Sequence, residues 1–229
     1  MAVIDRAMIQ YYDRLAPTYD AERFGNSYGR FLDAQERATL LRRLPMAAAS
    51  VLDLGCGTGR LTDFATLGCD ASIESLKLAA QRHLKKTFVG ADAASLPFRS
   101  NSFDAVFCFH VFMHLKPETI GQVLAEVGRV LKPGAIFIAD VASGLRRRLH
   151  PRPSTQWHGA TSLTRREFQR LAEPAGLELQ AAAGIGLIPI HRIPRRLRPA
   201  LAGLDRCFAA LAPDCASYIV GCFAKETPS

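Results

Sequence analysis

One short stretch decides the fold of this chain: Val51-Leu-Asp-Leu-Gly-Cys-Gly-Thr-Gly-Arg60. Its glycines occupy positions 55, 57 and 59 and directly follow an apolar run, which predicts a buried strand over residues 50–54 that ends in a glycine turn. Glycine allows positive φ and a close approach of the backbone to a ligand. Since open α/β sheets bind ligands at the carboxyl ends of their strands, we expect a ligand at this turn.

The acid inside the predicted strand, Asp53, helps to distinguish between ligands. A nicotinamide dinucleotide would favour Gly-x-Gly-x-x-Gly, with its pyrophosphate at the start of the next helix. This chain has Gly-Cys-Gly-Thr-Gly instead, and a second acid, Asp70, follows closely. A carboxylate at position 53 would repel a pyrophosphate but attract a cationic amino-acid group. The pattern therefore favours a ligand with a cationic end.

Predicted strands and helices alternate after this stretch. Strands are predicted at 68–70, 87–92, 103–109, 135–141, 177–186 and 216–224, and helices at 73–84, 119–131 and 164–175, the last with Thr164 as N-cap and Glu167 at the capping-box position. This alternation predicts an α/β fold with a doubly wound, mostly parallel, seven-stranded sheet. A helical cap over residues 1–45, hinged at 25–29, precedes the sheet, and a helical lid over 187–213 is inserted before the last strand.

Length and composition predict one domain with its own core. The 229 residues are 48% hydrophobic, and no apolar run approaches the ~20 residues of a membrane span. The first ten residues carry charge early and contain no continuous apolar segment, so no signal peptide is expected. The six cysteines are scattered without a Cys-x-x-Cys pair, which favours reduced thiols over a disulfide framework or a zinc site. We expect no bound metal and a cytoplasmic location.

The net charge of +8 is concentrated in the second part of the chain. Residues 1–141 contain 16 Lys and Arg against 15 Asp and Glu, whereas residues 142–229 contain 13 against 6. Such an excess indicates an acidic substrate, an anionic membrane, nucleic acid or simply a solvated arginine-rich surface. Residues 143–158 combine arginines and prolines without periodicity, and we predict a long basic loop there.

The predicted lid contains an amphipathic helix. After an arginine-rich start, its apolar side chains recur at spacings of four and three, at Leu197, Leu201, Leu204, Phe208 and Leu211. A helix of this type packs on its own domain, lies on a membrane surface, admits an amphiphilic substrate or meets a second subunit. Peripheral membrane contact therefore stays open, as does the choice between monomer and homodimer.

Five motifs occur in the order and spacing typical of one family. Besides the glycine stretch, they are Tyr11-Tyr-Asp-Arg-Leu-Ala-Pro-Thr-Tyr-Asp20, Gly90-Ala-Asp-Ala-Ala-Ser-Leu-Pro-Phe98, Phe103-Asp-Ala-Val-Phe-Cys-Phe-His-Val-Phe-Met-His-Leu115 and Arg129-Val-Leu-Lys-Pro-Gly134. Together they resemble the class I S-adenosylmethionine-dependent methyltransferases over roughly residues 10–141. The resemblance implies a single methyltransferase domain over residues 1–229, with a Rossmann-like sheet and a cofactor-binding core at 50–141.

The resemblance also implies S-adenosyl-L-methionine as cofactor, with S-adenosyl-L-homocysteine as product. Asp70 matches the acid that holds the ribose hydroxyls, Asp92 matches the acid that meets the adenine amino group, and the first helix closes over the cofactor. The implied cofactor-binding residues are Tyr11, Tyr19, Asp53, Gly55, Cys56, Gly57, Gly59, Asp70, Ala71, Asp92, Ala93, Cys108 and His110. Asp70 lies only 11 positions after Gly59, which leaves room for a helix of one or two turns. An ordinary turn aspartate is the alternative role for Asp70.

The implied reaction is an in-line displacement in which a lone pair of the substrate attacks the sulfonium methyl group. The protein mainly aligns the reactants, and it supplies a base where the nucleophile is protonated. Histidine suits that role because its ordinary pKa lies near neutral pH. The candidate catalytic bases are His158, at the end of the basic loop, and His110, after the fourth strand. We interpret His114 as a packing residue, and His191 opens the lid; exposure or packing is the alternative for each histidine.

We predict a methyltransferase that acts on a small-molecule acceptor, acidic or amphiphilic, with O-methylation of a natural product, sugar or lipid-like compound preferred. The alternatives are C-methylation of a quinone or other lipid, a nucleic-acid methyltransferase, and a cofactor-binding protein without turnover. No nucleic-acid partner is expected. Amino-methylating DNA enzymes of this fold usually carry an Asn/Asp-Pro-Pro-aromatic sequence after the fourth strand, where this chain has Cys108-Phe-His-Val111.

Overall fold

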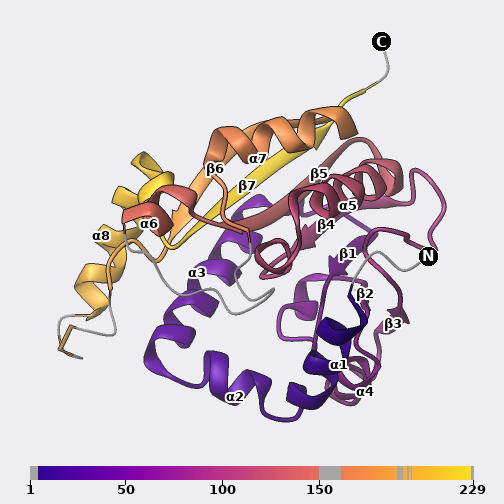
Figure 1. Ribbon diagram of the computed structural model, residues 1–229, viewed down its shortest axis with the longest axis horizontal. Helices are drawn as coiled ribbons and strands as arrows, with labels where there is room; N and C mark the ends of the chain where they lie inside the picture. Colours follow the sequence, from indigo (N-terminus) through magenta and orange to yellow (C-terminus); the bar gives the residue numbers. More distant parts are fainter. Residues whose placement is uncertain (1–4, 150–160, 190–192, 195, 197, 228–229) are drawn as a thin grey trace.

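The predicted strand before the glycine turn is β1 (Val51–Leu54), and it lies inside the sheet. The structure is a computed structural model that describes residues 5–149, 161–189, 193–194, 196 and 198–227 (Figure 1). All four residues of β1 are buried, including Asp53. An apolar strand with neighbours on both sides and helices on both faces is expected to be buried in this way.

The described residues form a seven-stranded sheet. The other strands are β2 (Leu67–Asp70), β3 (Thr87–Gly90), β4 (Phe103–Cys108), β5 (Leu131–Ala142), β6 (Leu177–Ile185) and β7 (Tyr218–Lys225). Their order is β3-β2-β1-β4-β5-β7-β6, in which β1 to β5 pair in parallel and β7 runs antiparallel to both of its neighbours. The predicted doubly wound, mostly parallel sheet is confirmed, and its strand order reverses between β1 and β4.

Helices cover both faces of this sheet (Figure 1). On one face, α5 (Pro117–Val130) and α7 (Arg165–Ala172) pack against Phe137 and Phe223 of the sheet. α7 begins with the predicted capping box, in which the Thr164 hydroxyl and the Glu167 carboxylate each accept from the other's backbone N–H. On the β1–β3 side of the sheet, α4 (Ile73–Arg82) joins β2 to β3. The link from β1 to β2 contains a single short helix, η1 (Thr62–Phe64), as its length predicts.

The N-terminal cap consists of three helices, α1 (Arg6–Leu15), α2 (Tyr19–Phe24) and α3 (Ser27–Arg43), which follow one another along the lower side of Figure 1. The predicted hinge at 25–29 is shorter in the structure, because the Asn26 side chain caps α3 by accepting from the N–H groups of Tyr28 and Gly29. An unpredicted break separates α1 from α2 at Pro17, which has no N–H to continue a helix.

Two segments after β5 differ from the prediction. Residues 144–149 form α6 (Gly144–Leu149) rather than part of a loop, because the Ser143 hydroxyl accepts from the N–H of Arg146 and starts a helix there. Residues 150–160 lie outside the described residues. α8 (Arg198–Leu211) is the predicted helix between β6 and β7, and its buried Asp205 accepts from Gln35 of α3 and from the N–H of Ile188.

Two bulk properties complete the fold. None of the helices in the described ranges is both long enough and apolar enough to cross a bilayer. All six cysteines are free thiols, four of them buried.

Candidate functional site

The carboxyl ends of β1, β2, β3 and β4 open onto one cavity. Its volume is about 1090 Å³ including the open mouth. The sheet side is formed by the glycine turn and by the segments that follow β2, β3 and β4. The opposite side is the cap, which contributes Met8, Ile9 and Tyr12 from α1, Ala16 directly after it, and Tyr19, Asp20 and Phe24 from α2. The cap thus closes over the point at which the strand order reverses.

The glycine turn owes its shape to positive backbone angles. Gly55, Gly57 and Gly59 have φ values of 72°, 51° and 80°, a region that L-residues with a Cβ avoid. The N–H groups of Gly55 and Cys56 both donate to the carbonyl of Cys69, at 2.7 and 3.1 Å, which ties the turn to β2. A Cβ on Gly55 would lie 2.2 Å from Cγ2 of Val111 in the loop after β4. Glycine at position 55 therefore lets two loops of the cavity wall meet.

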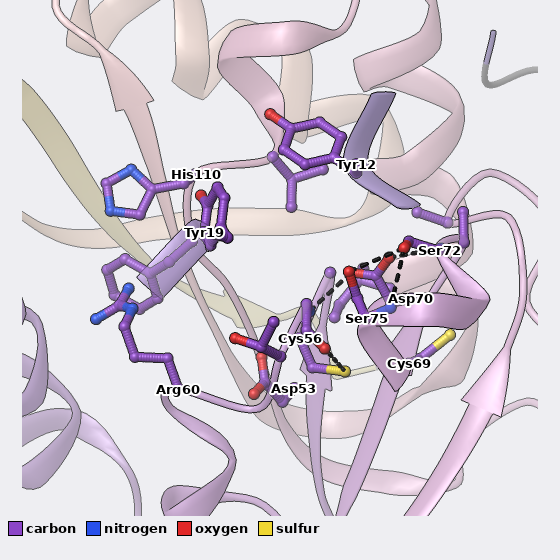
Figure 2. Close-up of a pocket in the computed structure, with 18 of the residues that line it drawn as sticks. Tyr12, Tyr19, Asp53, Cys56, Arg60, Cys69, Asp70, Ser72, Ser75 and His110 are labelled. Carbon is purple, nitrogen blue, oxygen red and sulfur yellow. Dashed lines mark hydrogen bonds between the residues drawn. The ribbon is translucent and has the colours of Figure 1, made fainter. Parts of the chain in front are cut away.

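Asp53 is a buried carboxylate at the bottom of the cavity (Figure 2). The Thr62 hydroxyl donates to its Oδ2 at 2.7 Å, and none of the ion pairs among the described residues involves it. Burial raises its pKa to about 7, against the opposing hydrogen bond from Thr62. A buried acid with this pKa is stabilised in its charged form by a cation placed beside it. The site at Asp53 therefore suits a cationic group of a ligand.

Asp70 ends β2 and also lines the cavity. Its Oδ2 accepts from the N–H of Gly57 and its Oδ1 accepts from the N–H of Ser72, both at 2.8 Å. Burial raises the pKa of its carboxyl group, although these backbone hydrogen bonds oppose the shift. Asp70 thus holds the glycine turn and the start of α4 in one arrangement. It is more than an ordinary turn residue, although its predicted ribose contact stays a prediction.

The structure brings most of the predicted cofactor-binding residues together. Nine of the 13 line the cavity: Tyr19, Asp53, Gly55, Cys56, Gly57, Asp70, Ala71, Ala93 and His110. Figure 2 shows Asp70 on one side, His110 and Tyr19 on the other, and Asp53 between them. The remaining four, Tyr11, Gly59, Asp92 and Cys108, are not among the lining residues. Each has a different reason.

Helix phase, turn geometry and burial explain why these four residues do not line the cavity. Met8, Tyr12 and Ala16, spaced by four, present one face of α1 to the cavity, and Tyr11 is out of phase with them. Gly59 faces α4, where its carbonyl lies 2.7 Å from His83 Nε2. Asp92 turns back to accept from the N–H of Ala94. Cys108 is the buried last residue of β4.

Tyr12 and His114 form an unpredicted pair in the cavity wall. The Tyr12 hydroxyl oxygen lies 2.9 Å from His114 Nε2, and the rings meet edge to face with centroids 5.8 Å apart. Burial raises the pKa of the Tyr12 phenol, so this hydroxyl stays protonated, and it donates to the imidazole in the tautomer whose Nε2 carries no proton. The four-residue spacing of Met8, Tyr12 and Ala16 is the sequence signal that could have identified Tyr12.

His110, a candidate base, lies in a buried ionic cluster instead of standing free. Its Nε2 is 2.7 Å from Glu36 Oε1 and its Nδ1 is 3.5 Å from Asp140 Oδ2. Glu36 also pairs with Arg60, at 2.6 Å, and Arg60 pairs with Asp33. The sequence signal for Glu36 is its place between Leu32 and Leu40, at spacings of four on the buried face of α3.

The other candidate base, His158, lies outside the described residues, as do Trp157 and His191. The structure therefore brings His110 to the cavity and leaves the role of His158 as a prediction.

Comparison with known proteins points to one family. Residues 52–139 match the family described as "Methyltransferase domain". The chain is 31% identical over 181 residues to the ubiquinone biosynthesis O-methyltransferase of Chromobacterium violaceum, covering 66% of this chain and 74% of that protein. It is 32% identical over 143 residues to the demethylmenaquinone methyltransferase of Lactiplantibacillus plantarum, covering 56% and 59%. The chain spans about half the length of other curated relatives, 51% and 47% of two of them.

Among solved structures, the fold is similar to that of an S-adenosylmethionine-dependent methyltransferase from Thermotoga maritima, described as a possible histamine N-methyltransferase. The TM-score is 0.72 with 17% sequence identity, and the match covers 96% of this chain and 100% of that chain. At this identity the likeness shows the fold alone.

Proposed function

Because the chain belongs to the class I S-adenosylmethionine-dependent methyltransferases, we propose that it methylates a hydroxyl group of a small-molecule acceptor. The observation that carries the proposal is the cavity itself. Asp53, Asp70 and the glycine turn lie on its sheet side, and the cap, whose lining residues are mostly apolar or aromatic, covers it from the other side.

The residues present fit S-adenosyl-L-methionine, which supplies an electrophilic sulfonium methyl group when bound. Asp53 is a buried carboxylate without a cationic partner among the described ion pairs, and it suits the ammonium group of an amino-acid end. Asp70 ends the neighbouring strand β2 and lines the same sheet side of the cavity, where it would hold the ribose. Gly57 has open space where a Cβ would stand, so the backbone there is accessible to a ligand.

The acceptor side of the cavity is mainly apolar. Among its lining residues, Met8, Ile9, Ala16 and Phe24 come from the cap, and Phe109 follows β4. Such a surface suits a compact acceptor with an apolar or aromatic body better than a sugar or a polymer. For methyl transfer, this enclosed wall would supply alignment of the reactants and exclusion of water.

A hydroxyl acceptor must also lose its proton, and the Tyr12–His114 pair is suited to receive it. In this proposal the acceptor oxygen bonds to the methyl carbon, and the carbon–sulfur bond breaks with its electrons going to sulfur. The acceptor proton passes to the Tyr12 oxygen while the Tyr12 proton passes to His114 Nε2, 2.9 Å away. His110 is less suited to this role, because Glu36 and Asp140 outweigh its burial and raise the pKa of its imidazole, which favours the form that already carries the proton.

Replacing Tyr12 by phenylalanine is expected to lower kcat about 100-fold, the usual size of a general-base contribution, while the Kd for S-adenosylhomocysteine changes less than threefold. Steady-state kinetics and calorimetry measure the two effects. Tyr11→Phe is the matched control, since Tyr11 lies on the same helix but does not line the cavity. Near-normal turnover of the Tyr12→Phe protein, with loss of turnover in His158→Ala, would assign the base to His158 instead.

The methyltransferase function itself is tested by two measurements in order. Calorimetric titration should show S-adenosylhomocysteine binding at micromolar concentration, and absence of binding would contradict the proposal. Incubation with methyl-labelled S-adenosylmethionine and a panel of phenols, hydroxylated lipids and quinols should then give O-methyl products by mass spectrometry. Products methylated at carbon would favour the second candidate, C-methylation of a quinone, which the relationship to a demethylmenaquinone methyltransferase supports. Binding without any product would favour a cofactor-binding protein.

The partners and location remain proposals. We propose a cytoplasmic protein without a nucleic-acid partner, whose acceptor is the small molecule described above. α8 exposes Leu204, Phe208 and Leu211 on one side, and α6 nearby carries three consecutive arginines (Figure 1). This surface fits an anionic bilayer or a second subunit equally well. α8 contributes no described residue to the cavity wall, so its role as a lid is a prediction that awaits a ligand.

A further inference from the structure

Glu36 joins the cap to two separate loops of the cavity wall. It belongs to α3, and its side chain is 1% exposed. One carboxylate oxygen lies 2.7 Å from His110 Nε2 and the other 2.6 Å from a terminal nitrogen of Arg60. Arg60 directly follows the glycine turn, and His110 follows β4. A single buried side chain therefore fixes two basic side chains that line the cavity and follow different strands of the sheet.

The backbone at His110 is strained, and its neighbours hold it in place. His110 has φ of 61°, one of two positive values among the described non-glycine residues, and such values cost energy and often occur at functional sites. The Asp140 carboxylate accepts from its N–H at 2.6 Å. Glu36 binds the far nitrogen of the ring, so the peptide and the imidazole are each held by a separate buried acid.

Every element around the His110 ring contributes a defined neighbour. α3 supplies Glu36, β5 supplies Asp140, and the turn after β1 supplies Arg60. The ring of Tyr218, from β7, meets it edge to face at 5.0 Å, and Phe24 of α2 lies 5.7 Å away. Phe24 also stacks on Arg60 at 3.7 Å. The two cations are thus enclosed by aromatic rings and balanced by buried carboxylates.

A buried ionic cluster of this kind is a weak source of stability, because desolvation of the charges offsets their attraction. Its geometry is the better guide to its role. Burial alone would raise the pKa of Glu36, but the charges and hydrogen bonds of His110 and Arg60 outweigh it and lower the pKa to about 2. Glu36 is therefore charged at neutral pH, and the protonated form of His110 is the form that it binds.

We infer that Glu36 is a positioning residue for methyl transfer, which holds His110 as an imidazolium and Arg60 beside it at the cap side of the cavity. The inference rests on the proposed function. In this arrangement His110 is a fixed cation that shapes the acceptor site and takes no proton from the acceptor. The same contacts of Glu36 with His110 and Arg60 hold the cap in place over the cavity.

The first test follows His110 itself and needs no activity. NMR titration of the ring Cε1–H in the ligand-free protein should show a midpoint for His110 above the ordinary value for histidine, because Glu36 and Asp140 raise its pKa. In Glu36→Gln the midpoint should fall toward the ordinary value for histidine, about 6.5. A wild-type midpoint near 6.5, or no shift in the variant, would overturn the inference whatever the substrate is.

The second test measures catalysis. Glu36→Gln should lower kcat at least tenfold at pH 8 with less than a threefold change in the Kd for S-adenosylhomocysteine. Its activity relative to wild type should fall further as pH rises from 6 to 8, because the imidazolium is lost as pH rises through the lowered pKa. Asp33→Asn is the matched control, since Asp33 pairs with Arg60 but not with His110; it should show no new pH dependence.

Glu36→Asp keeps the charge on a shorter side chain and should restore part of the activity and the flat pH profile. It also serves as the test variant where Glu36→Gln fails to fold. A loss in Glu36→Gln that is equal at all pH values would show a purely structural role and would overturn the inference. If the NMR result holds but no acceptor is methylated by the wild type, the proposed function fails while the charge state of His110 stands.

Discussion

Replacing Gly55 by alanine is expected to damage both the fold and the cofactor site. Alanine at position 55 would have to adopt φ near 72°, and its Cβ would lie 2.2 Å from Val111 Cγ2. A residue with a Cβ in this region costs about 1–2 kcal/mol, and the clash adds about 1–3 kcal/mol. Chemical denaturation should therefore show unfolding free energy lowered by roughly 2–5 kcal/mol. Calorimetry should show at least a tenfold loss of S-adenosylhomocysteine affinity, roughly 1.4 kcal/mol, because the turn or its neighbouring loop must move.

A matched control separates backbone strain from the clash. Gly176 has a similar φ of 66°, but its nearest potential contact to a Cβ is Glu226 at 3.8 Å. Gly176→Ala should thus cost only the strain, about 1–2 kcal/mol, and leave cofactor affinity unchanged. In Gly55→Ala/Val111→Ala the next neighbour would be Val111 Cβ at 3.6 Å, an ordinary contact. The double variant should regain most of the lost affinity; if it does not, contact with Val111 is not the cause.

The sheet and its family could be predicted because their signals are local. Each strand from β1 to β4 contains a short apolar run, β5 contains a longer one, and the glycine turn marks the end of β1. The Lys132-Pro-Gly134 segment, predicted to precede the fifth strand, lies inside β5. The predicted family, fold class and cofactor are confirmed by the comparisons and the sheet. The predicted helix boundaries are wrong where a single residue starts or ends a helix. Ser143 caps an unpredicted helix, and Pro17 divides the cap.

The cavity could be predicted from the sheet side but not from the cap side. Asp53 is next to the last residue of β1 and Asp70 is the last residue of β2, and topology brings such strand ends together. Tyr12, Glu36 and Asp140 belong to segments far apart in sequence, and their contacts depend on how the cap packs over the sheet. A carboxylate between Leu32 and Leu40 indicates only that Glu36 is buried. No pattern in the sequence identifies His110 and Arg60 as its partners.

Asp53→Asn is expected to weaken cofactor binding while it stabilises the ligand-free fold. Loss of a charged contact to the ammonium group should cost about 1.5–3 kcal/mol, or roughly 10- to 150-fold in the Kd for S-adenosylhomocysteine. Calorimetry between pH 6 and 8 measures this effect. Wild-type affinity should rise as pH passes through about 7, where Asp53 becomes charged, whereas the variant should show no such rise. Asp63→Asn, an exposed aspartate nearby, is the control and should behave as wild type.

The stability change follows from the same pKa. Between pH about 4 and about 7 an unfolded chain has Asp53 ionised, whereas the folded protein keeps it protonated. The folded state then binds more protons, so wild-type stability falls as pH rises through this window and the full penalty is present above it. A difference of about three pKa units corresponds to roughly 4 kcal/mol. Thermal unfolding should thus show Asp53→Asn more stable than wild type at pH 8 and nearly equal to it at pH 4.

A variant that is destabilised at pH 8 would mean that Asp53 already has a cationic partner in the ligand-free protein. The acid would then serve the fold and not the cofactor. Removing the charge of a buried carboxylate stabilises the folded protein only where no cation lies beside that carboxylate.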